Sequence, residues 1–224
     1  MLLGKEKLNR LSKAKVAVFG LGGVGSYALE ALARNGVGSF ILVDNDIVTL
    51  TNLNRQIIAL HSTIGLPKTQ VCRQRIKDIN PGAEVEAVQK FYLNEGEVCL
   101  DGVDYVLDAI DTVTAKLNLI QECGKKNIPI ISAMGCGGKL DPAKLTVTDI
   151  YSTGVCPLCA VMRKELRKRG VSSLEVVYST EKAQKPEPEM EPELKSNGRP
   201  VVGSCCFVPG SAGLLMAAKV IEKL

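Results

Sequence analysis

A glycine-rich turn is the first segment of this sequence whose residue types could do chemistry. Gly20, Gly22, Gly23 and Gly25 follow a short apolar run and open a segment with helical apolar spacing. Glycines let a backbone approach phosphate groups closely, and the N-terminus of the following helix presents unpaired N–H groups to their negative charge. Asp44 ends the next apolar run, where a carboxylate can hold ribose hydroxyls. These features predict a nucleotide site, and taken alone they suit NAD as well as ATP.

Polar and cationic side chains gather just beyond that second apolar run. Asp46, Asn52, Arg55 and Gln56 follow it closely, and Lys68 stands at the start of the next helical segment. Transfer of a hydride requires no such cations, whereas attack on the α-phosphate of a triphosphate develops negative charge that cations stabilise. Arg55 and Lys68 are therefore our candidate catalytic cations, and the cluster favours ATP over NAD.

Two carboxylates stand at the end of a later apolar run. Asp108 and Asp111 are expected at the carboxyl edge of the sheet, where doubly wound sheets bind their ligands. Mg²⁺ is usually held by one or two carboxylates together with phosphate oxygens. We therefore predict that Asp111 binds Mg²⁺ and that Asp108 caps the helix that follows.

Apolar runs alternate with helical patterns over the first 134 residues. The runs at 15–20, 39–44, 103–107 and 128–132 are predicted strands, and the segments 24–34, 67–80 and 114–126 are predicted helices. Strands that alternate with helices indicate parallel pairing with helices on both faces. The predicted fold class is α/β, with a Rossmann-like, doubly wound and mostly parallel sheet. Residues 1–134 form its ATP-binding core.

The remaining residues, 135–224, have a less regular pattern and are predicted to complete the same domain as a smaller C-terminal extension. Predicted strands lie at 145–150 and 174–178, and predicted helices at 157–168 and 209–224. Residues 181–199 hold five glutamates, three prolines and few apolar side chains. That composition is typical of a mobile, solvated loop.

The overall composition excludes several classes of protein. Hydrophobic residues make up 46% and charged residues 23%, which is ordinary for a globular domain, and the net charge of +4 does not demand an anionic partner. No apolar run reaches the length that spans a bilayer, and the sequence opens without a signal-peptide pattern. A cytoplasmic protein with no membrane partner is expected.

Eight cysteines without a secretory context are expected to be reduced thiols. Three of them are predicted to be buried small hydrophobes: Cys72, Cys99 and Cys123. Cys156 and Cys159 have the spacing of a zinc knuckle. Their candidate partners, Cys205 and Cys206, are adjacent, and adjacent residues of a strand point to opposite faces. We predict well under one zinc ion per chain.

Together these motifs resemble those of the ubiquitin-activating-enzyme-like ThiF/MoeB superfamily. The resemblance rests on the glycine turn at 20–25, Asp44, Asp46, Asn52, Arg55, Gln56, Lys68 and Asp111. It implies binding of ATP with Mg²⁺, adenylation of a carboxylate, release of pyrophosphate, and association as a homodimer. It also implies that Asp44 holds ribose, that Asn52, Arg55 and Lys68 bind phosphates, and that Asp111 binds the metal.

Three motifs in the second part resemble the branch of this superfamily that dehydrates threonylcarbamoyladenosine in tRNA. They lie at 156–170, 177–181 and 203–209. The resemblance implies that a threonyl carboxylate beside the anticodon is adenylated and that the neighbouring ureido group then closes a ring and expels AMP. It also implies an arginine-bearing segment ahead of residues 2–4, which Arg10 does not match. We expect either a longer natural chain or a basic contact from another residue.

A cluster of basic residues in the predicted helix 157–168 and just beyond it is the candidate contact to tRNA. Its members are Arg163, Lys164, Arg167, Lys168 and Arg169. Cations grouped on one helix suit phosphate binding, which fits the tRNA substrate implied by the resemblance. A solvated helix face is the alternative interpretation.

Three other functions stay open at this point. The nearest is adenylation of the C-terminal carboxylate of a ubiquitin-like sulfur carrier, which would use two regular Cys-x-x-Cys motifs and bound zinc. The second is an NAD-dependent oxidoreductase. The third is a non-catalytic nucleotide-binding scaffold for sulfur-transfer proteins. A sulfur-transfer partner protein is a further expectation.

Overall fold

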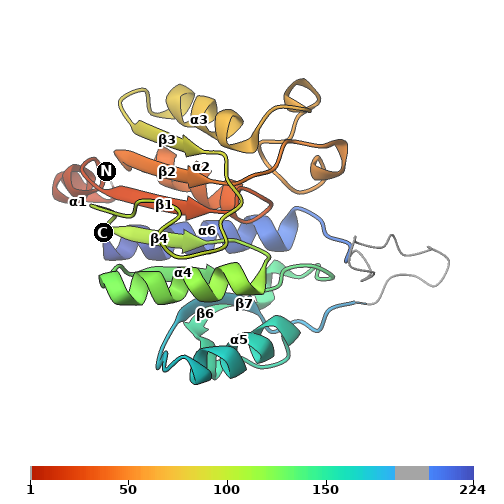
Figure 1. Ribbon diagram of the computed structural model, residues 1–224. Helices are drawn as coiled ribbons and strands as arrows, with labels where there is room; N and C mark the ends of the chain where they lie inside the picture. The colour runs from red at the N-terminus through yellow and green to blue at the C-terminus, as the bar shows by residue number, and fades with distance from the viewer. Residues whose placement is uncertain (1, 185–201) are drawn as a thin grey trace.

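A seven-stranded sheet with helices on both faces forms the molecule (Figure 1). The computed structural model describes residues 2–184 and 202–224. Its strands are β1 Lys15–Phe19, β2 Ser39–Val43, β3 Glu84–Val88, β4 Tyr105–Asp108, β5 Ile130–Ala133, β6 Leu145–Asp149 and β7 Glu175–Ser179. Its α-helices are α1 Gly4–Leu11, α2 Gly25–Arg34, α3 Lys68–Ile79, α4 Val113–Lys126, α5 Pro157–Lys168 and α6 Phe207–Lys223. Short 3-10 helices lie at Leu50–Asn52, His61–Thr63, Pro142–Lys144 and Ile150–Ser152.

The order of the strands places a ligand crevice at β1. The strands run β3-β2-β1-β4-β5-β7-β6, all neighbours parallel except β6, which pairs antiparallel with β7. Strands β2 and β3 are added on one side of β1, and β4 and β5 on the other side. Doubly wound sheets bind ligands at the switch point where this order reverses. Phe19 lies opposite Val43 on β2 and Asp108 on β4, so these three strands end at the same level. The predicted α/β fold class is confirmed.

Apolar side chains fill both sides of the sheet because its central strands are buried throughout. One core joins β1, β2 and β4 to α2, α3 and α6, and a second packs α4 against the opposite face. A third core links α4 to α5 and β7. In Figure 1 α4 passes in front of the sheet and α6 behind it. None of the helices in the described residues combines the length and apolarity needed to cross a bilayer.

Glycines let α6 cross α2 at close range. A Cβ atom added at Gly213 would stand 2.3 Å from the carbonyl oxygen of Val24, and Gly210 packs on the ring of Tyr27. Since Val24 directly precedes α2, this contact draws the start of α6 toward the glycine turn. Pro209 of α6 thereby reaches the edge of the crevice.

Among the α-helices and strands, α1 and β3 were not predicted from the sequence. β3 is an edge strand whose residues alternate between glutamate and small apolar side chains, so no long apolar run marks it. α1 is an eight-residue helix made mostly of polar side chains and buries only Leu11, so no apolar run marks it in the sequence. Of the three cysteines expected in the core, Cys72 and Cys123 are buried, but Cys99 is exposed, so that prediction was wrong.

The predicted loop at 181–199 begins too early in the sequence. The Glu181 carboxylate is buried and accepts hydrogen bonds from the backbone N–H groups of Leu140, at 3.1 Å, and Asp141, at 3.0 Å. Gln184 donates its backbone N–H to the carbonyl oxygen of Gly138 at 2.6 Å. Residues 185–199 of the predicted loop lie outside the described residues.

Candidate active site

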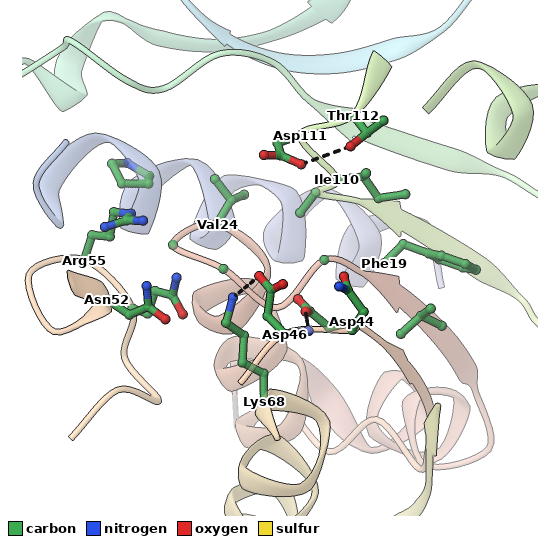
Figure 2. Close-up of a pocket in the computed structure, with 18 of the residues that line it drawn as sticks. Phe19, Val24, Asp44, Asp46, Asn52, Arg55, Lys68, Ile110, Asp111 and Thr112 are labelled. Carbon is green, nitrogen blue, oxygen red and sulfur yellow. Dashed lines mark hydrogen bonds and ion pairs between the residues drawn. The ribbon is translucent and has the colours of Figure 1, made fainter. Parts of the chain in front are cut away.

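A cavity of about 390 Å³ opens at the carboxyl ends of β1, β2 and β4 (Figure 2). Its lining includes Gly20, Gly22, Gly23, Asp44, Asp46, Asn52, Arg55, Gln56, Lys68 and Asp111, all of which were singled out from the sequence. Gly25 is the first residue of α2, directly behind the turn. Figure 2 shows Asp111 across the cavity from Asp46 and Lys68, with Arg55 and Asn52 toward one end and Phe19 toward the other.

The glycine turn is shaped by close backbone contacts. Gly20 has a φ of +85°, and a Cβ atom there would stand 2.6 Å from the carbonyl oxygen of Ala109. A Cβ atom at Gly25 would stand 1.8 Å from the carbonyl oxygen of Gly20. These contacts fold the turn tightly over the N-terminus of α2. The resulting cradle suits phosphate groups, because no side chain intervenes and helical N–H groups face the charge.

Asp44 holds the turn as well as facing the cavity. One carboxylate oxygen accepts a hydrogen bond from the N–H of Leu21 at 2.6 Å, and the other accepts from the N–H of Asp46 at 2.8 Å. Burial raises the pKa of the Asp44 carboxyl above its ordinary value, against the opposing effects of the Lys68 ammonium and of these two hydrogen bonds. Each oxygen retains a lone pair, so the carboxylate could also accept from ribose hydroxyls.

The cationic side of the cavity comes from two segments. Lys68 begins α3, and its side chain is 6% exposed and forms an ion pair with Asp46 at 2.7 Å. Arg55 follows a short 3-10 helix, where its guanidinium donates to the carbonyl oxygen of Thr51 at 2.8 Å and to the Asn54 side chain at 3.0 Å. Both cations line the cavity and can oppose the charge of a triphosphate.

Two amide side chains complete this wall. Asn52 is buried, and its side-chain oxygen accepts from the N–H of Thr49 at 3.2 Å. Gln56 is also buried, and its side-chain oxygen has no hydrogen-bond partner among the described residues. A buried amide oxygen left unpaired is costly unless a ligand or water supplies a donor. Gln56 therefore fits a bound polar ligand.

The donor set at Asp111 fits Mg²⁺ held jointly with phosphates. Asp111 is exposed to the cavity, and its carboxylate accepts only from the Thr112 hydroxyl, at 3.4 Å, with no cation paired to it among the described residues. No group of three or more His, Cys, Asp or Glu side chains in residues 2–184 and 202–224 could cage a metal. A single free carboxylate at a phosphate cradle is the arrangement in which Mg²⁺ keeps water and phosphate oxygens as its other ligands.

Several residues of the cavity were missed in the sequence. Lys90, Phe91 and Tyr92 follow β3, which carried no strand signal, and Tyr92 packs edge-on against Phe19 with ring centroids 5.0 Å apart.

The C-terminal part of the chain also contributes to the cavity lining, with Cys136, Gly137, Ser204 and Pro209. Asn54 donates to the carbonyl oxygen of Ser204 at 2.8 Å, which ties this part to the cationic wall.

Comparison with known proteins shows the family to which the chain belongs. The sequence matches the ThiF family over residues 1–224. The chain belongs to the ThiF family. It is 43% identical over 233 residues to the tRNA threonylcarbamoyladenosine dehydratase of Bacillus subtilis, which covers 100% of this chain and 92% of that protein. The resemblance inferred from the motifs is thereby confirmed.

A solved structure and a second relative place the chain within this ThiF family. The tRNA N6-threonylcarbamoyladenosine dehydratase of Escherichia coli in complex with ATP superposes with a TM-score of 0.86 at 34% identity, over 99% of this chain and 90% of that one. The sulfur carrier protein ThiS adenylyltransferase of Escherichia coli is 39% identical over 136 residues, which cover 58% of this chain and 53% of that protein. Similarity to the dehydratases therefore extends further along the chain.

The basic cluster of this ThiF-family chain lies outside the cavity and is not uniformly free. Arg163 donates to the carbonyl oxygen of Thr153 at 3.0 Å and to its hydroxyl. Lys168 and Arg169 both pair with Glu165, at 2.7 and 2.8 Å.

The other two cations of the basic cluster are less engaged. Arg167 stacks over the ring of Tyr151 at 5.0 Å, and Lys164 is exposed without an ion pair among the described residues. Lys164 and Arg167 are thus the cations best placed for an external anion.

The Cys-x-x-Cys motif lies at the start of α5, where both side chains are buried. The interaction between the two neighbouring thiols lowers the pKa of Cys156 and raises that of Cys159. Cys206 is the N-cap residue of α6 and Cys205 directly precedes it, and both are half-buried. The low zinc content expected from the sequence stays a prediction.

Proposed function

We propose that this protein uses ATP to dehydrate threonylcarbamoyladenosine in tRNA, closing the modified side chain into a ring through an acyl-adenylate. The observation that carries the proposal is the cavity, in which two cations and a free carboxylate surround a glycine turn shaped for phosphates. Similarity to tRNA threonylcarbamoyladenosine dehydratases over the whole chain supports the choice of substrate.

The first step joins a carboxylate of the substrate to the α-phosphorus of ATP. An oxygen of the threonyl carboxylate forms the new bond, and the bond to pyrophosphate breaks. Arg55 and Lys68 lie where they can oppose the charge that develops on the phosphates, and the glycine turn supplies backbone N–H groups. Mg²⁺ bound at Asp111 would neutralise negative charge on the phosphates as well.

The second step is intramolecular. The ureido group attacks the acyl carbon, loses a proton, and the bond between that carbon and AMP breaks. One carboxylate oxygen leaves with AMP, so the tRNA becomes lighter by one water. A reacting group held a few bonds away gains up to about 7–11 kcal/mol over a bimolecular reaction. The step therefore requires no covalent nucleophile from the protein.

Mass analysis of the tRNA nucleosides tests the proposal. The protein is incubated with ATP, Mg²⁺ and tRNA carrying open-form threonylcarbamoyladenosine, and the tRNA is then digested under mild conditions. The modified nucleoside should lose the mass of one water while AMP and pyrophosphate form. ADP as the nucleotide product would mean γ-phosphoryl transfer and would contradict the mechanism. Unchanged tRNA, combined with pyrophosphate exchange triggered by a ubiquitin-like carrier ending in Gly-Gly, would favour the sulfur-carrier alternative.

Two cations of α5 are expected to contact tRNA phosphates. Replacing Lys164 and Arg167 together with alanine should weaken tRNA binding and flatten its salt dependence by about one unit of slope per lost phosphate contact. Filter binding over a series of salt concentrations measures both. The matched control replaces Lys168 and Arg169, which are already paired with Glu165, and should change the slope less. An unchanged slope in the first variant would make this a solvated helix face.

The remaining expectations concern assembly and location. Homodimer formation and a sulfur-transfer partner protein are implied by the motif resemblance and stay predictions, as does a cytoplasmic location. Association of two copies is checked by light scattering of the purified protein.

A further inference from the structure

A buried ion pair lies behind the cavity, outside its lining. The ammonium of Lys116, on α4, stands 2.9 Å from the Asp108 carboxylate at the end of β4, and both side chains are 0% exposed. The prediction that Asp108 caps α4 was wrong, because the N-cap residue of this helix is Thr112. Burying two charges is expensive, and such a pair often adds little to stability compared with apolar side chains. The Asp108–Lys116 pair therefore suits a role in fixing local geometry rather than in adding stability.

The two residues of the ion pair hydrogen-bond both polar backbone groups of a single residue, Ile110. Lys116 donates to the carbonyl oxygen of Ile110 at 3.1 Å, and Asp108 accepts from the N–H of Ile110 at 3.1 Å. Ser132 on β5 donates its hydroxyl to Asp108 at 2.5 Å, which fixes that carboxylate in turn. Both polar groups of Ile110 are thus held by buried, charged partners.

The segment held in this way forms one wall of the active site. Ala109, just before Ile110, donates its N–H to the carbonyl oxygen of Phe19 at 2.8 Å, and its own carbonyl oxygen leaves no room for a side chain at Gly20. Asp111, just after Ile110, has only the weak contact to Thr112 to orient its carboxylate. The Ile110 backbone therefore sets where the Asp111 backbone lies, and from there the Asp111 side chain lines the cavity.

We propose that Lys116 is a positioning residue which, together with Asp108 and Ser132, fixes Ile110 so that Asp111 meets a phosphate-bound metal ion. The inference rests on the proposed function in one respect, the assignment of Asp111 as the Mg²⁺ ligand. Groups that orient a metal ligand without touching the metal commonly change metal affinity or activity by about 10–100-fold when removed.

The test measures binding of Mn²⁺, as a spectroscopic substitute for Mg²⁺, to the protein saturated with α,β-methylene-ATP. Lys116→Met is expected to weaken Mn²⁺ binding, followed by electron paramagnetic resonance, by about 10–100-fold. Affinity for the nucleotide in the presence of EDTA, measured by calorimetry, should stay within a few fold. The matched control is Lys126→Met, which removes an exposed lysine of the same helix that pairs with Asp101 at 3.3 Å, and it should change neither value.

Two further variants keep the test decisive if Lys116→Met does not fold. Asp108→Asn combined with Lys116→Met removes both charges at once, so no buried charge is left unpaired. Ser132→Ala removes one hydrogen bond and no charge, and it should weaken Mn²⁺ binding in the same direction by a smaller factor. Normal Mn²⁺ affinity in the folded variants would overturn the proposal. An equal loss of metal-free nucleotide affinity would also overturn it, because the whole site would then have collapsed.

Binding measurements separate this inference from the proposed function. Asp111→Asn should reproduce the loss of Mn²⁺ affinity, and a normal affinity in that variant would refute the positioning role by removing its target. If the wild-type protein binds nucleotide and metal as expected but leaves threonylcarbamoyladenosine unchanged, the proposed function fails while the role of Lys116 stands.

Discussion

Replacing Arg55 with alanine should lower the rate of AMP formation by about 10²–10³-fold, the usual loss when one preorganised donor to a developing charge is removed. The guanidinium lines the cavity, and its hydrogen bonds reach only neighbouring residues of its own loop. The fold should therefore persist, with an unchanged melting temperature. Asp111→Ala should cause a similar loss, since its carboxylate is exposed and makes one weak contact.

The rate is followed as AMP released in the presence of modified tRNA. Arg73→Ala provides the matched control, because Arg73 is an exposed arginine of α3 that does not line the cavity. It should retain full activity. Near-normal AMP release by folded Arg55→Ala would show that the cationic wall does not act on the triphosphate.

Substituting alanine for Gly25 should abolish ATP binding and lower the free energy of unfolding by about 3 kcal/mol or more, at the upper end for overpacked sites. The added Cβ would stand 1.8 Å from the carbonyl oxygen of Gly20, and a backbone atom at that distance cannot rotate away. Either the turn or the first residues of α2 must move. Both movements displace the N–H groups that face the phosphates.

The same substitution at Gly124, in the last turn of α4, tests whether the contact between Gly25 and Gly20 is responsible. A Cβ atom there would have no atom within 4 Å, and alanine should stabilise the helix by about 0.5–1 kcal/mol. Urea unfolding measures both variants, and calorimetry measures ATP affinity. If both substitutions changed the free energy of unfolding in the same direction, the close approach of Gly25 to Gly20 would not explain why position 25 requires glycine.

The nucleotide-facing wall could be predicted from the sequence because its signals are local. The glycine turn, Asp44 and Asp111 each follow a buried strand within a few residues, and parallel strands bring their carboxyl ends to one edge. Spacing along the chain therefore stands in for position in space. The helices α2 to α5 also carry enough apolar periodicity to be placed within a few residues.

The rest of the site depends on contacts that spacing does not encode. Lys90 and Tyr92 enter the cavity only because β3 pairs at the edge of the sheet, although that strand has no apolar run. Ser204 and Pro209 enter because glycines let α6 approach α2. Asp108 was expected to cap α4 and Lys116 carried no signal in the sequence, and only the packing of α4 on β4 brings the two together as a buried ion pair.

Asp44 has a consequence for how ribose recognition can be studied. Its carboxylate holds the glycine turn through Leu21 and the following segment through Asp46, so removing it would disturb the proposed phosphate and ribose contacts together. A substitution of Asp44 therefore cannot separate a change in the structure of the turn from the loss of a contact to ribose. The informative alteration lies in the nucleotide: 2′-deoxy- and 3′-deoxy-ATP delete one hydroxyl each and leave the protein's own hydrogen bonds in place. A difference between them would report on ribose alone.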